Sequence, residues 1–103
     1  MAQAVVHGNT VYLRGQVPAD FSTPLKEQVE STLAKVDALL LETGSGKDKL
    51  LSAQIWIKDM ADFKAMNDIW CDWLECKPAR ACVQAPMAHP DILFEVMIVA
   101  AKN

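Results

Sequence analysis

The residue of this chain best suited to bind a charged ligand is Arg80, which stands in the apolar run Pro78–Val83 (PARACV). The composition of the run predicts a buried β-strand. A guanidinium buried without a partner is strongly unfavourable, and arginine can hold a carboxylate through two parallel hydrogen bonds. Three interpretations therefore stand: Arg80 pairs with an internal acid, it is an edge arginine whose stem alone is buried, or it receives an anionic ligand.

The cysteines and histidines give no comparable signal. Cys71, Cys76 and Cys82 are odd in number and lack the spacing of a disulfide framework, so we expect free thiols in a reducing compartment. The two histidines, His7 and His89, are far in sequence from Cys71 and Cys76. We therefore expect no metal site.

The composition is that of one globular domain, residues 1–103. The chain is 51% hydrophobic and 22% charged, which is apolar for its length and indicates surface covered by other copies of the chain. Its net charge of −3 and scattered lysines argue against nucleic-acid binding. No apolar run is long enough to span a bilayer. Because Met1 leads almost directly into a strand-like segment, we expect no signal peptide and a cytoplasmic protein.

The first half of the chain predicts a β-hairpin and a long helix. Residues 2–6 and 10–17 are β-prone and flank the turn His7-Gly8-Asn9, and Pro18 is expected to end the second strand. Thr23-Pro24 begins the helix, with Pro24 at its first position, and Gly44-Ser45-Gly46 ends it. One face of this helix is apolar, formed by Leu25, Val29, Leu33, Val36 and Leu40.

The second half predicts a strand, a helix and two further strands. Residues 50–58 have branched and aromatic strand content, and Asp59 is placed to cap a helix that ends at Lys77-Pro78. Strands over 79–85 and 92–101 follow. The expected order is β-β-α-β-α-β-β, an α+β fold with one sheet backed by two helices.

The last strand is apolar on both faces. One face is Ile92, Phe94, Val96, Ile98 and Ala100; the other is Leu93, Glu95, Met97, Val99 and Ala101. Two helices cover only one face of such a sheet, so the other must be buried elsewhere. We expect a homo-oligomer with its sheets turned inward.

The ordered motifs of the chain resemble the Rid/YjgF family of enamine/imine deaminases. The segments that carry the resemblance are Gln3-Ala4-Val5, Gly8–Tyr12, Gly15–Pro18, Lys58–Phe63 with Asn67, Pro78–Val83 and Glu95-Val96. The likeness runs from about Gln3 to Ala101 and is closest to a short, divergent branch. It implies a chorismate-mutase-like fold, a homotrimer and ligand pockets between subunits. It also implies hydrolysis of 2-imino or enamine acids to 2-oxo acids and ammonia, with no cofactor and no metal.

The resemblance also implies which residues form the site. Arg80 stands where the family's arginine holds the substrate carboxylate, and we take it as the catalytic residue. The expected substrate-binding residues are Arg80, Arg14, Gly15, Asn67, Cys82 and Met97. Cys82 is expected to wall the pocket rather than act as a nucleophile. For Asn67, contact with ligand and a capping or bridging role remain equally open.

The chain departs from the family pattern at three places. Met97 stands where many members have a water-orienting glutamate, and a thioether cannot act as a base. Arg14 replaces a small serine before Gly15. The sequence begins at the first strand, without the segment that usually brings an aromatic side chain to the pocket rim. For Glu95, one step along the strand from the usual register, we favour a structural role, and pairing with Arg80 is one form of it.

Three functions follow from these observations. The leading hypothesis is a homotrimeric deaminase of 2-imino or enamine acids. Its rival, motivated by Met97, is a non-catalytic protein that binds small 2-oxo or 2-imino carboxylic acids. The third, an RNA-cleaving protein, conflicts with the acidic net charge and with the lack of a catalytic histidine pair.

Overall fold

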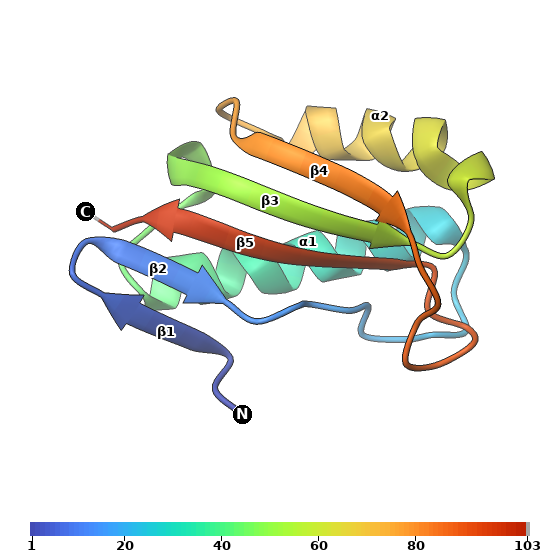
Figure 1. The fold of residues 1–103 in the computed structure, drawn as a ribbon, viewed down its shortest axis with the longest axis horizontal. Coiled ribbons are helices and arrows are strands. Elements are labelled where there is room, and N and C mark those ends of the chain that lie inside the picture. Colours follow the sequence, from blue (N-terminus) through green and yellow to red (C-terminus); the bar gives the residue numbers. More distant parts are fainter. Residues whose placement is uncertain (103) are drawn as a thin grey trace.

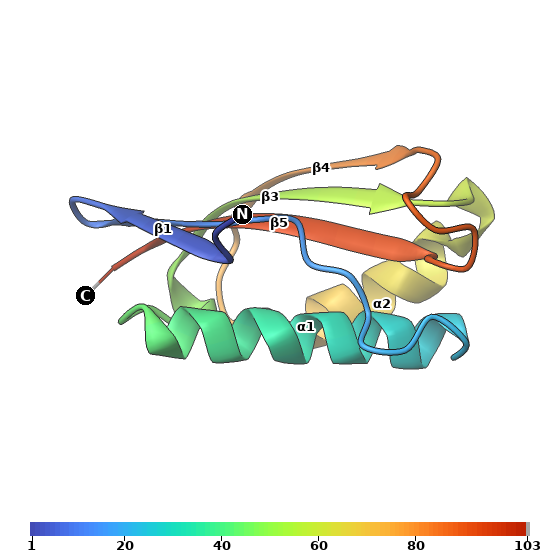
Figure 2. The same cartoon turned by 90° about the horizontal axis from the view of Figure 1, so that it is seen from below.

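A computed structural model, which describes residues 1–102, shows one five-stranded sheet in the order β1-β2-β5-β3-β4 (Figure 1). The chain forms β1 (Ala4–His7), β2 (Thr10–Leu13), α1 (Leu25–Glu42), β3 (Leu50–Ile57), α2 (Phe63–Trp73), β4 (Ala79–Gln84) and β5 (Phe94–Ala101), with short 3-10 turns over Lys47–Lys49 and Met60–Asp62. Both helices lie on one side of the sheet (Figure 2). The expected α+β fold and its element order are confirmed.

The hairpin forms as expected, but its second strand is shorter. Gly8 has a φ of 58°, as in the type II′ turn, where glycine takes the first central position. Strand β2 ends at Leu13 rather than Val17. Beyond it the backbone N–H of Arg14 donates to Gln3, and Gln16 then pairs with Val96 of β5 as an isolated bridge. The sheet ladder is thus interrupted at Gly15.

Helix α1 begins and ends close to the predicted positions, whereas α2 is shorter than predicted, because it begins at Phe63 after a separate 3-10 turn and ends at Trp73, before Lys77-Pro78. Pro24, expected at the first helical position, instead precedes α1 at the N-cap position, and Gly44, with a φ of 80°, follows the end of the helix. The predicted apolar face of α1 is buried at Val29, Leu33, Val36 and Leu40. The Asp59 carboxylate accepts a hydrogen bond of 2.9 Å from the Ala61 N–H and so caps the 3-10 turn that leads into α2.

The core lies between the sheet and the two helices, and the other face of the sheet is bare. On β5, Phe94, Val96, Ile98 and Ala100 are all buried toward the helices. On the opposite face Tyr12 is 45% exposed and Met97 is 41% exposed. No part of residues 1–102 covers that face (Figure 2). The predicted uncovered apolar face is therefore present.

The expectation that Pro78–Val83 forms a buried strand is wrong. Strand β4 pairs only with β3, in parallel, and forms an edge of the sheet. Most of its residues are exposed, Arg80 included. An edge strand of small residues has the same composition as a buried one, and it has a neighbour on one side only. Arg80 therefore avoids the desolvation cost that a buried guanidinium would carry.

Candidate functional site

Arg80 is held by α2 and not by an acid. It lies opposite Ala53 of β3, a core residue, so its side chain leaves the sheet on the helix side. There its Nη1 donates a hydrogen bond to Oδ1 of Asn67, and its guanidinium stands 5.6 Å from the ring centre of Phe63. Within residues 1–102 no carboxylate forms an ion pair with it. The alternative interpretation, in which Arg80 pairs with Glu95 of its own chain, is therefore not found among residues 1–102.

Cys82 lies two residues beyond Arg80, on the same side of β4. It pairs in register with the core residue Ile55 and is half-buried. Burial raises the pKa of the Cys82 thiol above its ordinary value, and the positive charge of Arg80 lowers it in part. A thiol with a raised pKa is neutral near pH 7. A neutral thiol suits a residue that lines a pocket beside the Arg80 guanidinium.

Gly15 and Glu95 form a second group of site residues. A side chain built on Gly15 would overlap Oε2 of Glu95, which lies directly against the glycine backbone. Glu95 is half-buried, and it has no side-chain hydrogen bond or ion pair among the described residues. A carboxylate without a partner beside a glycine backbone is open to a bound water or ligand. Sequence patterns do not predict this contact, because it depends on the bridge between Gln16 and Val96 of β5.

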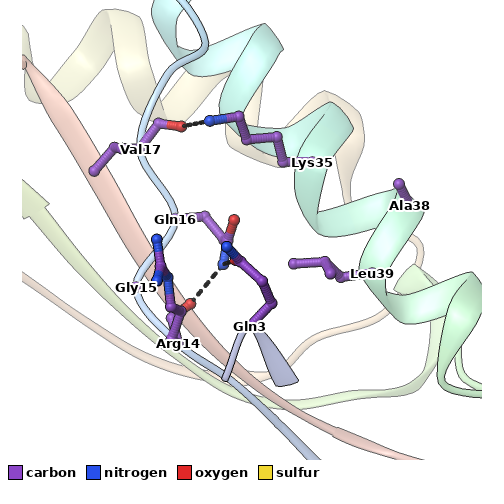
Figure 3. Close-up of a pocket in the computed structure, with 8 residues that line it drawn as sticks. All are labelled: Gln3, Arg14, Gly15, Gln16, Val17, Lys35, Ala38 and Leu39. Carbon is purple, nitrogen blue, oxygen red and sulfur yellow. Dashed lines mark hydrogen bonds between the residues drawn. The ribbon is translucent and has the colours of Figure 1, made fainter. Parts of the chain in front are cut away.

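A cavity of about 280 Å³ adjoins Gly15 between the end of β2 and α1. It is lined by Gln3, Arg14, Gly15, Gln16, Val17, Lys35, Ala38 and Leu39. In Figure 3 the side chains of Gln3 and Gln16 meet at its centre, and Lys35 reaches the carbonyl of Val17. Arg14 thus adjoins Gly15 as expected, while Lys35 is a lining residue that sequence reasoning missed.

Met97 lies on the bare face of the sheet. It stands opposite Gln54 of β3 and, together with Arg80 and Val99, lines a shallow hollow of about 320 Å³. Met97 and Glu95 share this face because they are two residues apart on β5. Met97 thus lies near both groups of site residues and has no direct contact with the Asn67 end of Arg80.

One chain does not bring the two groups together. Arg80, Asn67 and Cys82 lie at the β4 edge, whereas Arg14, Gly15 and Glu95 lie where β2 meets β5. Strand β3 stands between β4 and β5, and both β3 and β5 stand between β4 and the end of β2. With neighbouring strands about 4.8 Å apart, the backbone of Glu95 on β5 is about 10 Å from β4, and the end of β2, where Arg14 and Gly15 lie, is about 14 Å from β4. A small ligand that touches both groups needs them to come from different subunits.

The remaining chemistry-bearing side chains have structural contacts. His89 is exposed and packs against Phe21 with ring centres 4.9 Å apart. Trp70 lies in the core, and Trp73 Nε1 donates a 3.0 Å hydrogen bond to Asp37. Among residues 1–102 no three potential metal ligands gather. In the same part of the chain no helix is long and apolar enough to cross a membrane.

Comparison with known proteins places this geometry in a family. The family model described as Endoribonuclease L-PSP matches residues 1–102. The chain belongs to the Rid/YjgF family. The RutC family protein YoaB of Escherichia coli is 40% identical over 102 residues, covering 97% of this chain and 89% of that protein.

Solved structures of the Rid/YjgF family share the fold. A YjgF family member from Neisseria meningitidis, NMB1025, aligns with a TM-score of 0.94 at 38% identity, over 98% of this chain and 86% of that one. The Rid family protein YyfA of Yersinia pestis aligns with a TM-score of 0.92 at 28% identity, over 98% and 86%. The predicted family and the chorismate-mutase-like fold are confirmed.

Proposed function

We propose that this Rid/YjgF protein hydrolyses reactive 2-imino or enamine acids to 2-oxo acids and ammonia. The reaction takes place in pockets between the subunits of a cytoplasmic homotrimer. The main observation behind the proposal is the environment of the Arg80 side chain. Its guanidinium is exposed, oriented by Asn67 and Phe63, and free of any acid partner in residues 1–102. Such a group is ready to bind a carboxylate through two parallel hydrogen bonds.

The bare face of the sheet supports the assembly. Exposed apolar side chains cover it, among them Val5, Tyr12, Val83 and Met97. Apolar patches of this kind are typical of protein–protein interfaces. Packing the sheets of neighbouring subunits against one another buries these side chains. It also allows Arg80 of one subunit to approach Gly15 and Glu95 of the next.

Glu95 supplies the chemistry that Met97 lacks. Arg80 holds the substrate carboxylate, and the backbone at Gly15 holds the reacting end. Glu95 orients a water and takes its proton as the oxygen attacks the C=N carbon, and Glu95 then delivers this proton to the nitrogen. Collapse of the resulting carbinolamine releases ammonia and leaves the 2-oxo acid. An enamine enters the same path after protonation at carbon gives the imine. A positioned general base contributes about 10²–10⁴-fold.

The test of this function is ammonia release from imines that an amino-acid oxidase generates in the same vessel. The wild-type protein should accelerate release above the spontaneous rate, and Arg80→Ala should abolish the acceleration. Lys77→Ala removes another exposed cation next to β4 and should leave the rate unchanged. No acceleration by the wild type, or full activity of Arg80→Ala, would contradict the proposal.

A non-catalytic carboxylate binder is the second candidate, and Met97 favours it. In that case the wild type binds 2-oxo acids through Arg80 but does not accelerate imine hydrolysis. Met97→Glu would then introduce the missing carboxylate on the same strand face as Glu95 and should raise the rate from the spontaneous level. If the wild type is already active and Glu95→Gln removes that activity, Glu95 is the base and the binder is excluded.

RNA cleavage, which the description of the family model names, has little support in this chain. His7 is in the hairpin and His89 is in the β4–β5 loop, and these segments lie at opposite ends of the sheet (Figure 1). One chain therefore provides no histidine pair for acid–base cleavage. The net charge of −3 also opposes binding of a polyanion.

A further inference from the structure

The cavity beside Gly15 is positively charged in a protein that is negatively charged overall. Arg14 and Lys35 line it and no acidic residue does, and the Glu95 carboxylate lies next to it, against the Gly15 backbone. The whole chain carries a net charge of −3. A cleft with one sign of charge concentrates ligands of the opposite sign.

Both cations keep hydrogen-bonding capacity. Within residues 1–102 Arg14 forms no ion pair. Lys35 Nζ donates one hydrogen bond of 2.9 Å to the Val17 carbonyl. An ammonium has three donors, so two remain for a ligand. The half-buried Lys35 stem is fixed by this bond, and its charge therefore stays at the wall of the cavity (Figure 3).

The rest of the lining suits a short carbon chain that ends in a polar group. Val17, Ala38 and Leu39 supply apolar surface. Gln16 is only 4% exposed, and its Nε2 is taken by Gln3 and by the Arg14 carbonyl. At about 280 Å³ the cavity is slightly smaller than most small-molecule sites. It is sized for a compact metabolite.

We propose that this cavity receives a second carboxylate, so that the preferred substrates are 2-imino dicarboxylic acids. The inference rests on the proposed function, because it places the reacting end of the substrate beside Gly15, between Arg80 of a neighbouring subunit and the cavity. Arg80 then binds the carboxylate next to the imine, and Arg14 with Lys35 binds the carboxylate at the other end. Substrates with an apolar side chain leave both cations without an anionic partner.

The test compares the calorimetric Kd of 2-oxoglutarate with that of 2-oxobutyrate on the intact protein. A hydrogen bond to a charged group contributes about 1.5–3 kcal/mol, so the wild type should favour the dicarboxylate about 10- to 100-fold. The double variant Arg14→Gln/Lys35→Gln should bring the two Kd values close together, mainly because its binding of 2-oxoglutarate is weaker. Lys26→Gln is the control, since Lys26 lies on α1 outside the cavity and pairs with Glu30.

Equal affinity of the wild type for the two ligands, or an unchanged ratio in the double variant, would overturn the inference. The proposed function is tested separately by Arg80→Ala. This variant should bind both ligands more weakly by the same factor, so the ratio of the two Kd values should not change. If Arg80→Ala leaves both Kd values unchanged while the double variant binds 2-oxoglutarate more weakly, the cavity binds carboxylates but the proposed function fails. If the wild type binds neither ligand, both proposals fail.

Discussion

The Glu95 carboxylate occupies the space that a side chain at position 15 would fill. A Cβ on Gly15 would overlap Oε2 of Glu95, although Gly15 lies beyond the end of β2, Glu95 is on β5, and the two residues are far apart in sequence. Gly15 does not have a positive φ. The glycine is therefore required for the position of the carboxylate and not for the backbone conformation.

Gly15→Ala should reduce deaminase activity and leave the fold intact. The added methyl group must push the flexible Glu95 carboxylate aside, and a displacement of about 1 Å in a catalytic group can cost about 10²-fold in rate. The free energy of unfolding should change by less than about 1 kcal/mol. Ammonia release and thermal unfolding, measured on the same preparation, separate the two effects.

The matched control for this variant is Gly8→Ala. Gly8 has open space around its Cβ position but a φ of 58°, so alanine there should cost about 1–2 kcal/mol of stability without loss of activity. The reverse pattern, with Gly15→Ala fully active, would show that the position of Glu95 has no part in the reaction.

Val99→Asp should break the assembly. Val99 lies on the bare face of β5, opposite Ser52 of β3 and Tyr12 of β2. In a trimer with inward-facing sheets the new carboxylate is buried without a partner, which is strongly unfavourable. Light scattering should give a mass about three times that of one 11.4 kDa chain for the wild type and a lower mass for the variant.

Leu41→Asp provides the control for assembly. Leu41 is 74% exposed on α1, in the layer that faces away from the bare side of the sheet. The Leu41→Asp variant should remain trimeric. A monomeric wild type, or a trimeric Val99→Asp, would contradict the proposed packing.

The alkylation of Cys82 should require a higher pH than that of an ordinary cysteine. Burial raises the pKa of this thiol, the Arg80 charge partly offsets the rise, and only the thiolate reacts. The midpoint of the rate–pH curve with iodoacetamide should therefore lie above about 8.5, the value of a free cysteine. Arg80→Gln removes the offsetting charge and should move the midpoint higher still.

Mass spectrometry of the peptide that contains Cys82 gives this midpoint, and the unfolded protein in denaturant is the reference. The shift should disappear on unfolding. A folded-state midpoint below that of the unfolded protein would mean that Cys82 is an activated thiol, and its assignment as a pocket wall would be wrong.

Local patterns predicted the elements and the bare face because both depend on side-chain periodicity. The buried face of α1 and the alternation along β5 follow directly from the spacing of residues such as Val29 and Phe94. Position within the sheet is not encoded in this way. The run around Arg80 has the composition of a central strand, yet β4 is at an edge.

The site was predictable only where a single residue type carried its chemistry. Arg80 was identifiable because a cation in an apolar run needs an explanation. The contact between Gly15 and Glu95 was not, since it depends on the bridge between Gln16 and Val96, which forms after the β2 ladder has stopped. Lys35 was likewise hidden, because a lysine on an amphipathic helix has the pattern of a solvated residue.

The proposed function requires Arg80 of one subunit to act together with Glu95 of its neighbour, and complementation between two inactive variants tests this pairing. Arg80→Ala and Glu95→Gln are each prepared, mixed in equal amounts, unfolded together and refolded, and ammonia release is measured. Random trimers contain intact pockets at about one interface in four, so activity should return to about a quarter of the wild-type value. Activity that stays at the level of the separate variants would place both residues in one subunit's site, or in no common site, and would contradict the claim.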